Sequence, residues 1–185
     1  MGVRDSGLTG WRMSTKVRHE RLGDNRADGV RVVVDTSVLL PGVFFGGPPR
    51  DVLAAWRAGQ FEVVVSPEVL REYVRVGERL SARFPGAGFE RVLEMIAANA
   101  TLVSAPPLPE AVCEDSDDDK FLACAVAAGA GYVVSSDKAL LATSPYRNVK
   151  VVRSRDFLDM LRVTAAPAQD DRGAAARVDH RHPAG

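Results

Sequence analysis

Acidic side chains at three places in this sequence have the chemistry and the spacing to bind a divalent cation. Asp35 directly follows the β-branched run at residues 30–34, and Asp137 follows a similar run at residues 132–134 after two serines. The third place is the acidic run at residues 114–119, which precedes a helix-like segment. Carboxylate oxygens are the ligands that Mg²⁺ and Mn²⁺ prefer. The pattern therefore indicates a candidate site for a divalent cation.

Each of these acids also has a purely structural explanation. Asp at a strand-to-helix junction is a routine turn or N-cap residue, and acids in a first helical turn complement the helix dipole by about 0.3 to 1 kcal/mol each. Yet five of the six residues from 114 to 119 are acidic, and one or two cations would remove their mutual repulsion. Within this run, Asp119 lies three residues before Leu122, on the core-adjacent edge of the expected helix.

The segment at residues 66–73 opens another expected helix and carries two glutamates. Helical spacing puts Leu70 and Tyr73 on one face. Glu72 falls on the other, where the simplest explanation is a surface ion pair with Arg75. Arginines recur along this helix every four residues, at positions 71, 75, 79 and 83. Such a stripe suits a phosphate backbone, and a solvated, salt-bridged face explains it equally well.

The elements that would position these acids alternate along the chain. Short apolar runs predict strands at residues 30–34, 61–65, 101–103, 132–134 and 149–152. Helical spacing occurs at residues 52–56, 69–80, 92–96, 122–126 and 157–161. Strands separated by helices predict right-handed crossovers and a mostly parallel sheet covered on both faces. Ligands of such a sheet bind beyond the carboxyl ends of its strands, which is where Asp35 and Asp137 are placed.

Length and composition favour a single folded domain. The 185 residues, 46% of them hydrophobic, suffice for one core. Charged residues with few large apolar neighbours predict a flexible N-terminal extension at residues 1–29, and an Ala/Pro/Asp/Arg-rich composition predicts a disordered tail at residues 164–185. The folded domain is therefore expected at residues 30–163. The three histidines fall in the extension and the tail, which argues against a histidine-based mechanism.

Charge and cysteine content exclude several classes of protein. The 24 basic and 24 acidic residues balance, so any polyanion must be held locally. Two cysteines are too few for a disulfide-stapled secreted domain or a cysteine zinc site, which favours a reducing cytoplasm. Apolar runs in the sequence fall short of the roughly 18 to 20 residues that a membrane span needs.

Four segments together resemble a PIN domain, and most closely the VapC-like toxin components of bacterial toxin-antitoxin systems. They are Val32-Val33-Val34-Asp35-Thr36-Ser37-Val38-Leu39, Ser66-Pro67-Glu68-Val69-Leu70-Arg71-Glu72-Tyr73, Asp117-Asp118-Asp119-Lys120-Phe121-Leu122-Ala123 and Val134-Ser135-Ser136-Asp137-Lys138-Ala139-Leu140-Leu141. The segments occur in the family's order within residues 30–163. The resemblance implies a three-layer α/β/α sandwich with a mostly parallel sheet. It also implies a Mg²⁺- or Mn²⁺-dependent endoribonuclease that gathers acids at one edge of that sheet.

Position by position, the resemblance implies four catalytic acids that also bind the metal. They are Asp35, Glu72, Asp119 and Asp137. Glu68 competes with Glu72 for the position on the helix. Asp115 and Asp118 are further candidates beside Asp119.

The sequence departs from the usual pattern of this branch at two places. Ser37 stands where Asn is usual, and Ser135-Ser136 stands where Thr-Gly is usual. A hydroxyl is retained at Ser135. The departures therefore concern the positioning of Asp137 or of the attacking water rather than the presence of the acids.

The resemblance also implies partners, namely an RNA substrate, a cognate antitoxin protein and a second copy of the chain in a homodimer. The main alternative is a PIN-like module that binds RNA or protein without cleaving, and a complete set of acids argues against it. A haloacid-dehalogenase-type phosphatase would need a second Asp where Ser37 stands. A phosphoacceptor receiver domain would need an Asp after residues 61–65, where Ser66-Pro67 follows.

Overall fold

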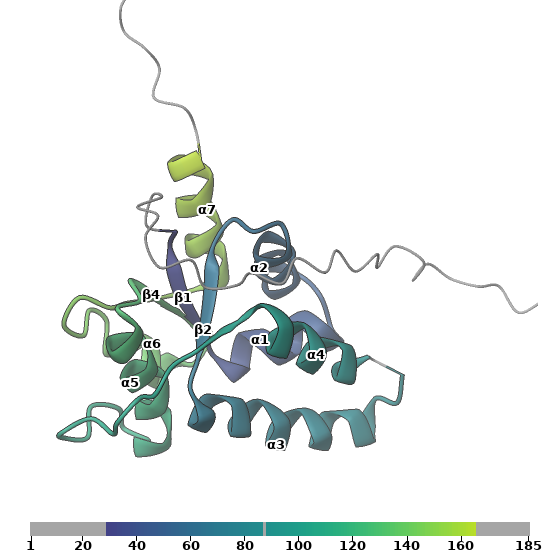
Figure 1. The fold of residues 1–185 in the computed structure, drawn as a ribbon, viewed down its shortest axis with the longest axis horizontal. Helices are drawn as coiled ribbons and strands as arrows, with labels where there is room; N and C mark the ends of the chain where they lie inside the picture. The colour runs from purple at the N-terminus through teal and green to yellow at the C-terminus, as the bar shows by residue number, and fades with distance from the viewer. Residues whose placement is uncertain (1–28, 87, 166–185) are drawn as a thin grey trace, which may run out of the picture.

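A computed structural model of the chain describes residues 29–86 and 88–165 (Figure 1). The predicted extension at residues 1–29 and the predicted tail at residues 164–185 lie outside this part of the chain, apart from Gly29 and the last two residues of the final helix.

The centre of the molecule is a parallel sheet of five strands. In chain order these are β1 (Arg31–Val34), β2 (Glu62–Val65), β3 (Thr101–Leu102), β4 (Tyr132–Val134) and β5 (Lys150–Val152). Their order across the sheet is β3-β2-β1-β4-β5, with every described pairing parallel. Strands β2 and β3 therefore lie on one side of β1, and β4 and β5 lie on the other side. The boundary between β1 and β4 is the topological switch point, where parallel sheets open a ligand crevice.

The strands form where the sequence offers short β-branched runs. Val32, Val33 and Val34 of β1 are buried, as are Val133 and Val134 of β4. Strands covered on both faces have continuous apolar runs rather than alternating ones, which is why these segments were recognisable.

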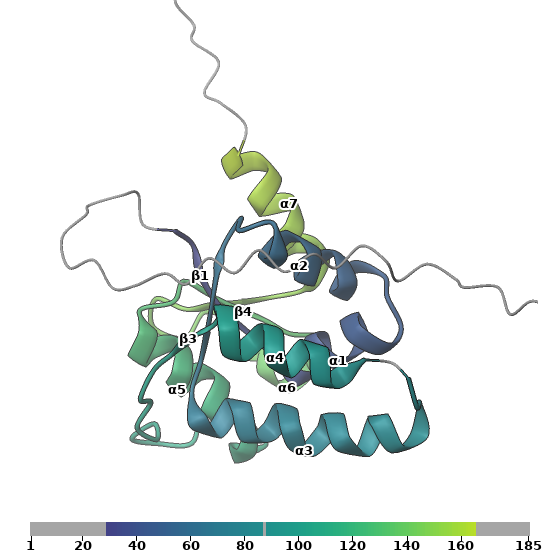
Figure 2. The same ribbon diagram turned by 45° about the vertical axis from the view of Figure 1, so that its right-hand side comes forward.

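Helices cover both faces of this sheet (Figures 1 and 2). They are α1 (Thr36–Phe44), α2 (Pro48–Arg57), α3 (Pro67–Arg83), α4 (Phe89–Asn99), α5 (Asp119–Ala128), α6 (Lys138–Ala142) and α7 (Ser154–Ala165), with a 3₁₀ turn η1 (Ser116–Asp118) before α5. Helix α5 packs across β1, β2 and β4, and α7 packs against α2. The predicted α/β/α sandwich with a parallel sheet is confirmed. Within the described ranges, the helices are too short or too polar to cross a membrane.

Close packing of α1 and α3 against their neighbours depends on glycine. A Cβ on Gly42 would lie 2.8 Å from the carbonyl oxygen of Pro49, and a Cβ on Gly77 would lie 1.8 Å from the ring of Phe89. These two glycines let α1 approach α2 and let α3 approach α4. Helix α3 also contacts α5, which brings its first turns close to the acidic run (Figure 2).

Candidate active site

Asp35 occupies the switch point between β1 and β4. It stands at the N-cap position of α1, where its side chain makes no capping hydrogen bond. The residue is 4% exposed, and its Oδ2 accepts hydrogen bonds from the hydroxyls of Ser37, at 2.5 Å, and Ser135, at 2.6 Å. Burial raises the pKa of Asp35, the two hydroxyls oppose that rise, and the charge of Asp137 adds to it.

Asp137 lies across the switch point, directly after the loop that follows β4. Its Oδ1 accepts hydrogen bonds from the amides of Ala139, at 2.7 Å, and Leu140, at 3.0 Å, so this Asp does cap a helix, the short α6. Its own amide donates to the hydroxyl of Ser135 at 2.9 Å. The side chain of Asp137 thus caps α6 and also lies close enough to Asp35 for its charge to act on that carboxylate.

Asp118 is the third acid that the structure brings to this point. Its pKa is raised to about 6, mainly by burial and then by the negative charges of Asp35 and Asp137. Asp118 stands at the N-cap position of α5 and, like Asp35, makes no capping hydrogen bond with its side chain. The charges of Asp35 and Asp137 are therefore close enough to Asp118 to raise its pKa.

Asp119, which the resemblance points to as the third acid, is directed elsewhere. Its carboxylate accepts hydrogen bonds from the backbone amides of Cys113, at 2.8 Å, and Val112, at 3.2 Å. It therefore ties the loop before η1 to the first turn of α5. Phe121 and Leu122 are both buried, so Asp118 and Asp119 each lie three residues before a core residue. Helical spacing in the sequence therefore could not decide which of the two acids lies on the core-adjacent edge of α5.

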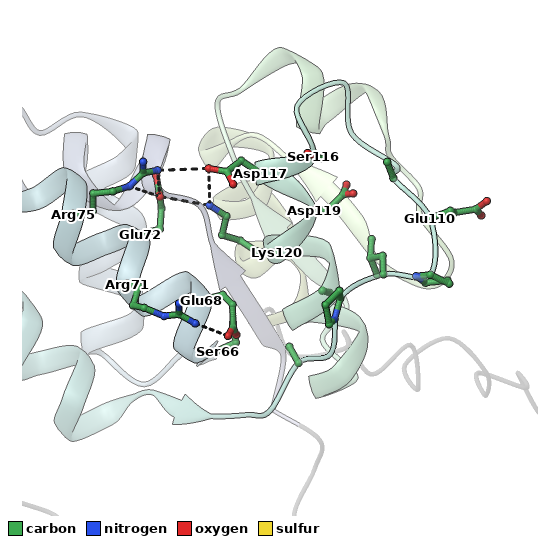
Figure 3. Close-up of a pocket in the computed structure, with 16 residues that line it drawn as sticks. Ser66, Glu68, Arg71, Glu72, Arg75, Glu110, Ser116, Asp117, Asp119 and Lys120 are labelled. Atoms are coloured by element: carbon green, nitrogen blue, oxygen red, sulfur yellow. Dashed lines mark hydrogen bonds and ion pairs between the residues drawn. The ribbon is translucent and has the colours of Figure 1, made fainter.

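Glu72 lies in a pocket between α3 and η1, with a volume of about 730 Å³ (Figure 3). Its carboxylate pairs with Arg75, as helical spacing suggested, and also with Lys120, 48 residues away, at 3.5 Å. Asp117 completes the network, at 3.5 Å from Lys120 and 3.7 Å from Arg75. Glu72 is therefore paired with two basic side chains, Arg75 and Lys120. The competing Glu68 pairs with Arg71 at 2.7 Å on the same helix.

These pairs bear on the arginine stripe of α3. Arg71 and Arg75 are each paired with a glutamate of their own helix, and both are exposed. The salt-bridged face is thus the better explanation for the first half of the stripe. Arg79 and Arg83 are exposed farther along the helix.

The donor atoms at the switch point suit a hard divalent cation. Carboxylates and hydroxyls are the oxygen ligands of Mg²⁺ and Mn²⁺. Burial and then the negative charges of Asp35 and Asp137 raise the pKa of Asp118, and a bound cation would offset the contribution of those charges. The two cysteines do not compete, since burial raises the pKa of each thiol to about 12. In the described residues, no three acidic, cysteine or histidine side chains are already gathered tightly enough to ligate one ion. The donor chemistry fits, and closing the three carboxylates around an ion requires side-chain movement.

A sequence model described as "PIN domain" matches residues 31–139, which include all of the acids discussed above. The chain belongs to the PIN domain family. This PIN domain, a nuclease-type fold, is also similar to the crystal structure of PAE2754 from Pyrobaculum aerophilum. The two chains are 17% identical, with a TM-score of 0.49 over 72% of this chain and 98% of that one. No curated protein matches the chain.

The raised pKa of Asp118 predicts how the metal-free PIN domain responds to pH. Asp118 keeps its proton to about pH 6 in the folded state, against about 3.9 in an unfolded chain. Between these values the folded state binds more protons, so the free energy of unfolding falls as pH rises from about 4 to 6 and then levels. Urea denaturation in EDTA should show this fall in the parent and a smaller one in Asp118→Asn. Equal slopes in the two proteins would contradict the assignment.

Proposed function

We propose that this PIN domain is an endoribonuclease that uses Mg²⁺ or Mn²⁺ to hydrolyse RNA. The observation that supports it best is the placement of Asp35 and Asp137 at the switch point, where the hydroxyl of Ser135 donates to Asp35 and accepts from the amide of Asp137. Asp118 lies close enough for their charges to raise its pKa. These three acids would hold the ion. When bound, a divalent cation lowers the pKa of a water molecule and stabilises charge on the phosphate oxygens.

The chain's own residues prepare this site. Ser37 and Ser135 donate to Asp35 and favour its ionised form in a buried position, which is the form that binds a metal. Lys138 follows Asp137 directly and is exposed, so its ammonium is placed to hold a phosphate of the substrate.

Asp119 and Glu72 take supporting roles in this proposal. Asp119 anchors the loop at Val112 and Cys113. Glu72 forms ion pairs with the side chains of Arg75 and Lys120. We therefore place Asp118 in the ligand set where the resemblance points to Asp119.

The cellular role proposed for this nuclease is that of the toxin in a type II toxin-antitoxin system. It rests on the resemblance to VapC-like toxins, which also suggests a small antitoxin protein as partner and a homodimer. The low cysteine content favours a cytoplasmic location. Co-expression with the product of the adjacent gene tests it, because an antitoxin should co-purify with the chain and suppress both cleavage and growth arrest.

The activity is tested with purified full-length protein and an end-labelled RNA that contains single-stranded loops. We expect cleavage in Mg²⁺ or Mn²⁺, none in EDTA, and a loss of at least about 100-fold in Asp35→Asn. The matched control is Asp159→Asn, since Asp159 is an exposed acid of α7 that pairs with Arg162, and this variant should cleave like the parent. Cleavage that is equal in all three proteins would indicate a contaminant. RNA binding without cleavage by the parent would instead favour the binding module.

A further inference from the structure

Ser136 donates two hydrogen bonds to Ser37 across the switch point. The amide of Ser136 donates to the hydroxyl of Ser37 at 3.0 Å, and the hydroxyl of Ser136 donates to the carbonyl oxygen of Ser37 at 3.1 Å. The first residue lies in the opening turn of α1 and the second in the loop between β4 and α6, 99 positions apart. Two hydrogen bonds that join different atoms of Ser136 to different atoms of Ser37 fix both the separation and the orientation of these segments.

This pair is connected to two acids of the switch point, Asp35 and Asp137. The hydroxyl of Ser37 has one proton, which it donates to Asp35, so it can meet the amide of Ser136 only as an acceptor. Ser135 is arranged in the same way, because it donates to Asp35 and accepts from the amide of Asp137. Asp35 therefore orients two hydroxyls, and each hydroxyl orients an amide of the loop that leads to Asp137.

The two members of this pair are also positions where the sequence departs from the usual pattern of the VapC-like branch. A glycine in place of Ser136 would have no hydroxyl to donate to the carbonyl of Ser37. The longer side chain of an asparagine in place of Ser37 would move the acceptor that the amide of Ser136 uses. The two departures are therefore coupled through direct contact.

We propose that Ser37 and Ser136 are positioning residues of the nuclease site, which together set the placement of Asp35 relative to Asp137. The inference rests on the proposed function for its catalytic consequence. The hydrogen bonds themselves do not depend on it. Ser135 alone ties the loop to Asp35 at one point, and the Ser37–Ser136 pair adds the second point that prevents the loop from turning about the first.

The test compares Ser37→Thr, which keeps the hydroxyl, with Ser37→Val, which has nearly the same shape as Thr without it. We expect Ser37→Thr to bind Mn²⁺ within about threefold of the parent and Ser37→Val to bind it about tenfold more weakly. At saturating Mn²⁺ the Val variant should lose kcat for RNA cleavage with little change in KM, because substrate contacts are retained. Ser81→Ala, near the C-terminal end of α3, is the control for loss of a partly exposed serine hydroxyl.

A second readout follows the loop directly. Hydrogen exchange of the Ser136 amide should accelerate at least about fivefold in Ser37→Val and remain slow in Ser37→Thr. Combining Ser37→Val with Ser136→Ala should weaken Mn²⁺ binding by less than the product of the two single effects, as expected for residues that act as one unit.

The outcomes separate this inference from the proposed function. A parent that neither takes up Mn²⁺ nor cleaves RNA would overturn the proposed function, and the exchange of the Ser136 amide in the Val and Thr variants would then decide the pairing alone. Equal Mn²⁺ affinity and equal exchange in Ser37→Val and the parent would overturn the inference. Multiplicative effects in the double variant would overturn it as well.

Discussion

Asp118→Asn is expected to lower the rate of RNA cleavage by about 100- to 1,000-fold, whereas Asp119→Asn should retain the rate within about tenfold. The carboxylate of Asp118 is coupled to Asp35 and Asp137, and an amide in its place cannot supply the charge that holds the cation. Asp119 accepts two backbone hydrogen bonds, and the amide oxygen of an asparagine can still accept one of them. Initial rates of cleavage at saturating Mg²⁺ measure both variants.

The two variants need a control from the same acidic run. Glu114→Gln removes a charge from an exposed position at the start of that run and should cleave RNA like the parent. A severe loss in Asp119→Asn with little loss in Asp118→Asn would restore the ligand set that the resemblance implies. It would also remove Asp118 from the proposed site.

Tyr73→Phe is expected to destabilise the PIN domain by about 1 to 3 kcal/mol. Tyr73 is fully buried, and its hydroxyl donates to the carbonyl oxygen of Val34, the last residue of β1. Burial raises the pKa of this hydroxyl well above its usual range, so it remains a donor at every pH of interest. Phenylalanine keeps the volume and leaves the carbonyl without this partner. Because Val34 immediately precedes Asp35, the rate of RNA cleavage should fall as well.

Urea denaturation in EDTA measures this effect as a lower midpoint at an unchanged slope. Tyr146→Phe is the matched control, since the ring of Tyr146 contacts Arg147 and a phenyl ring preserves that contact. It should change the free energy of unfolding by less than about 0.5 kcal/mol. An unchanged midpoint in Tyr73→Phe would show that the hydroxyl does not hold the end of β1.

The sheet was predictable because buried parallel strands leave a local signal. The run predicted at residues 30–34 is one residue longer than β1, and the run predicted at residues 132–134 has the same bounds as β4. Helix α1 escaped prediction because Pro41 and Gly42 lie inside it, and both residues disfavour helices in isolation. In the fold, Gly42 is required by the close approach of α2. Local propensity was overridden there by packing.

The sequence predicted that Asp35 and Asp137 lie at one edge of the sheet, but not which side chains they contact. Asp35 and Asp137 follow strands, so the topology alone brings them together. The contact of Lys120 with Glu72 spans 48 residues, and the contact of Ser37 with Ser136 spans 99. Such pairings depend on the three-dimensional register of separate elements and leave no periodic pattern in the sequence. The choice between Asp118 and Asp119 likewise depends on η1, a single turn that rotates the acidic run before α5 begins.

Calorimetric titration of the folded, full-length protein with MnCl₂ at pH 7.5 tests most directly whether the acids of the switch point hold a divalent cation. We expect saturable uptake by the parent, a loss of affinity of at least about tenfold in Asp35→Asn and in Asp118→Asn, and parent-like uptake in Asp159→Asn. Absence of uptake at millimolar MnCl₂, or equal uptake by all four proteins, would contradict this cation site.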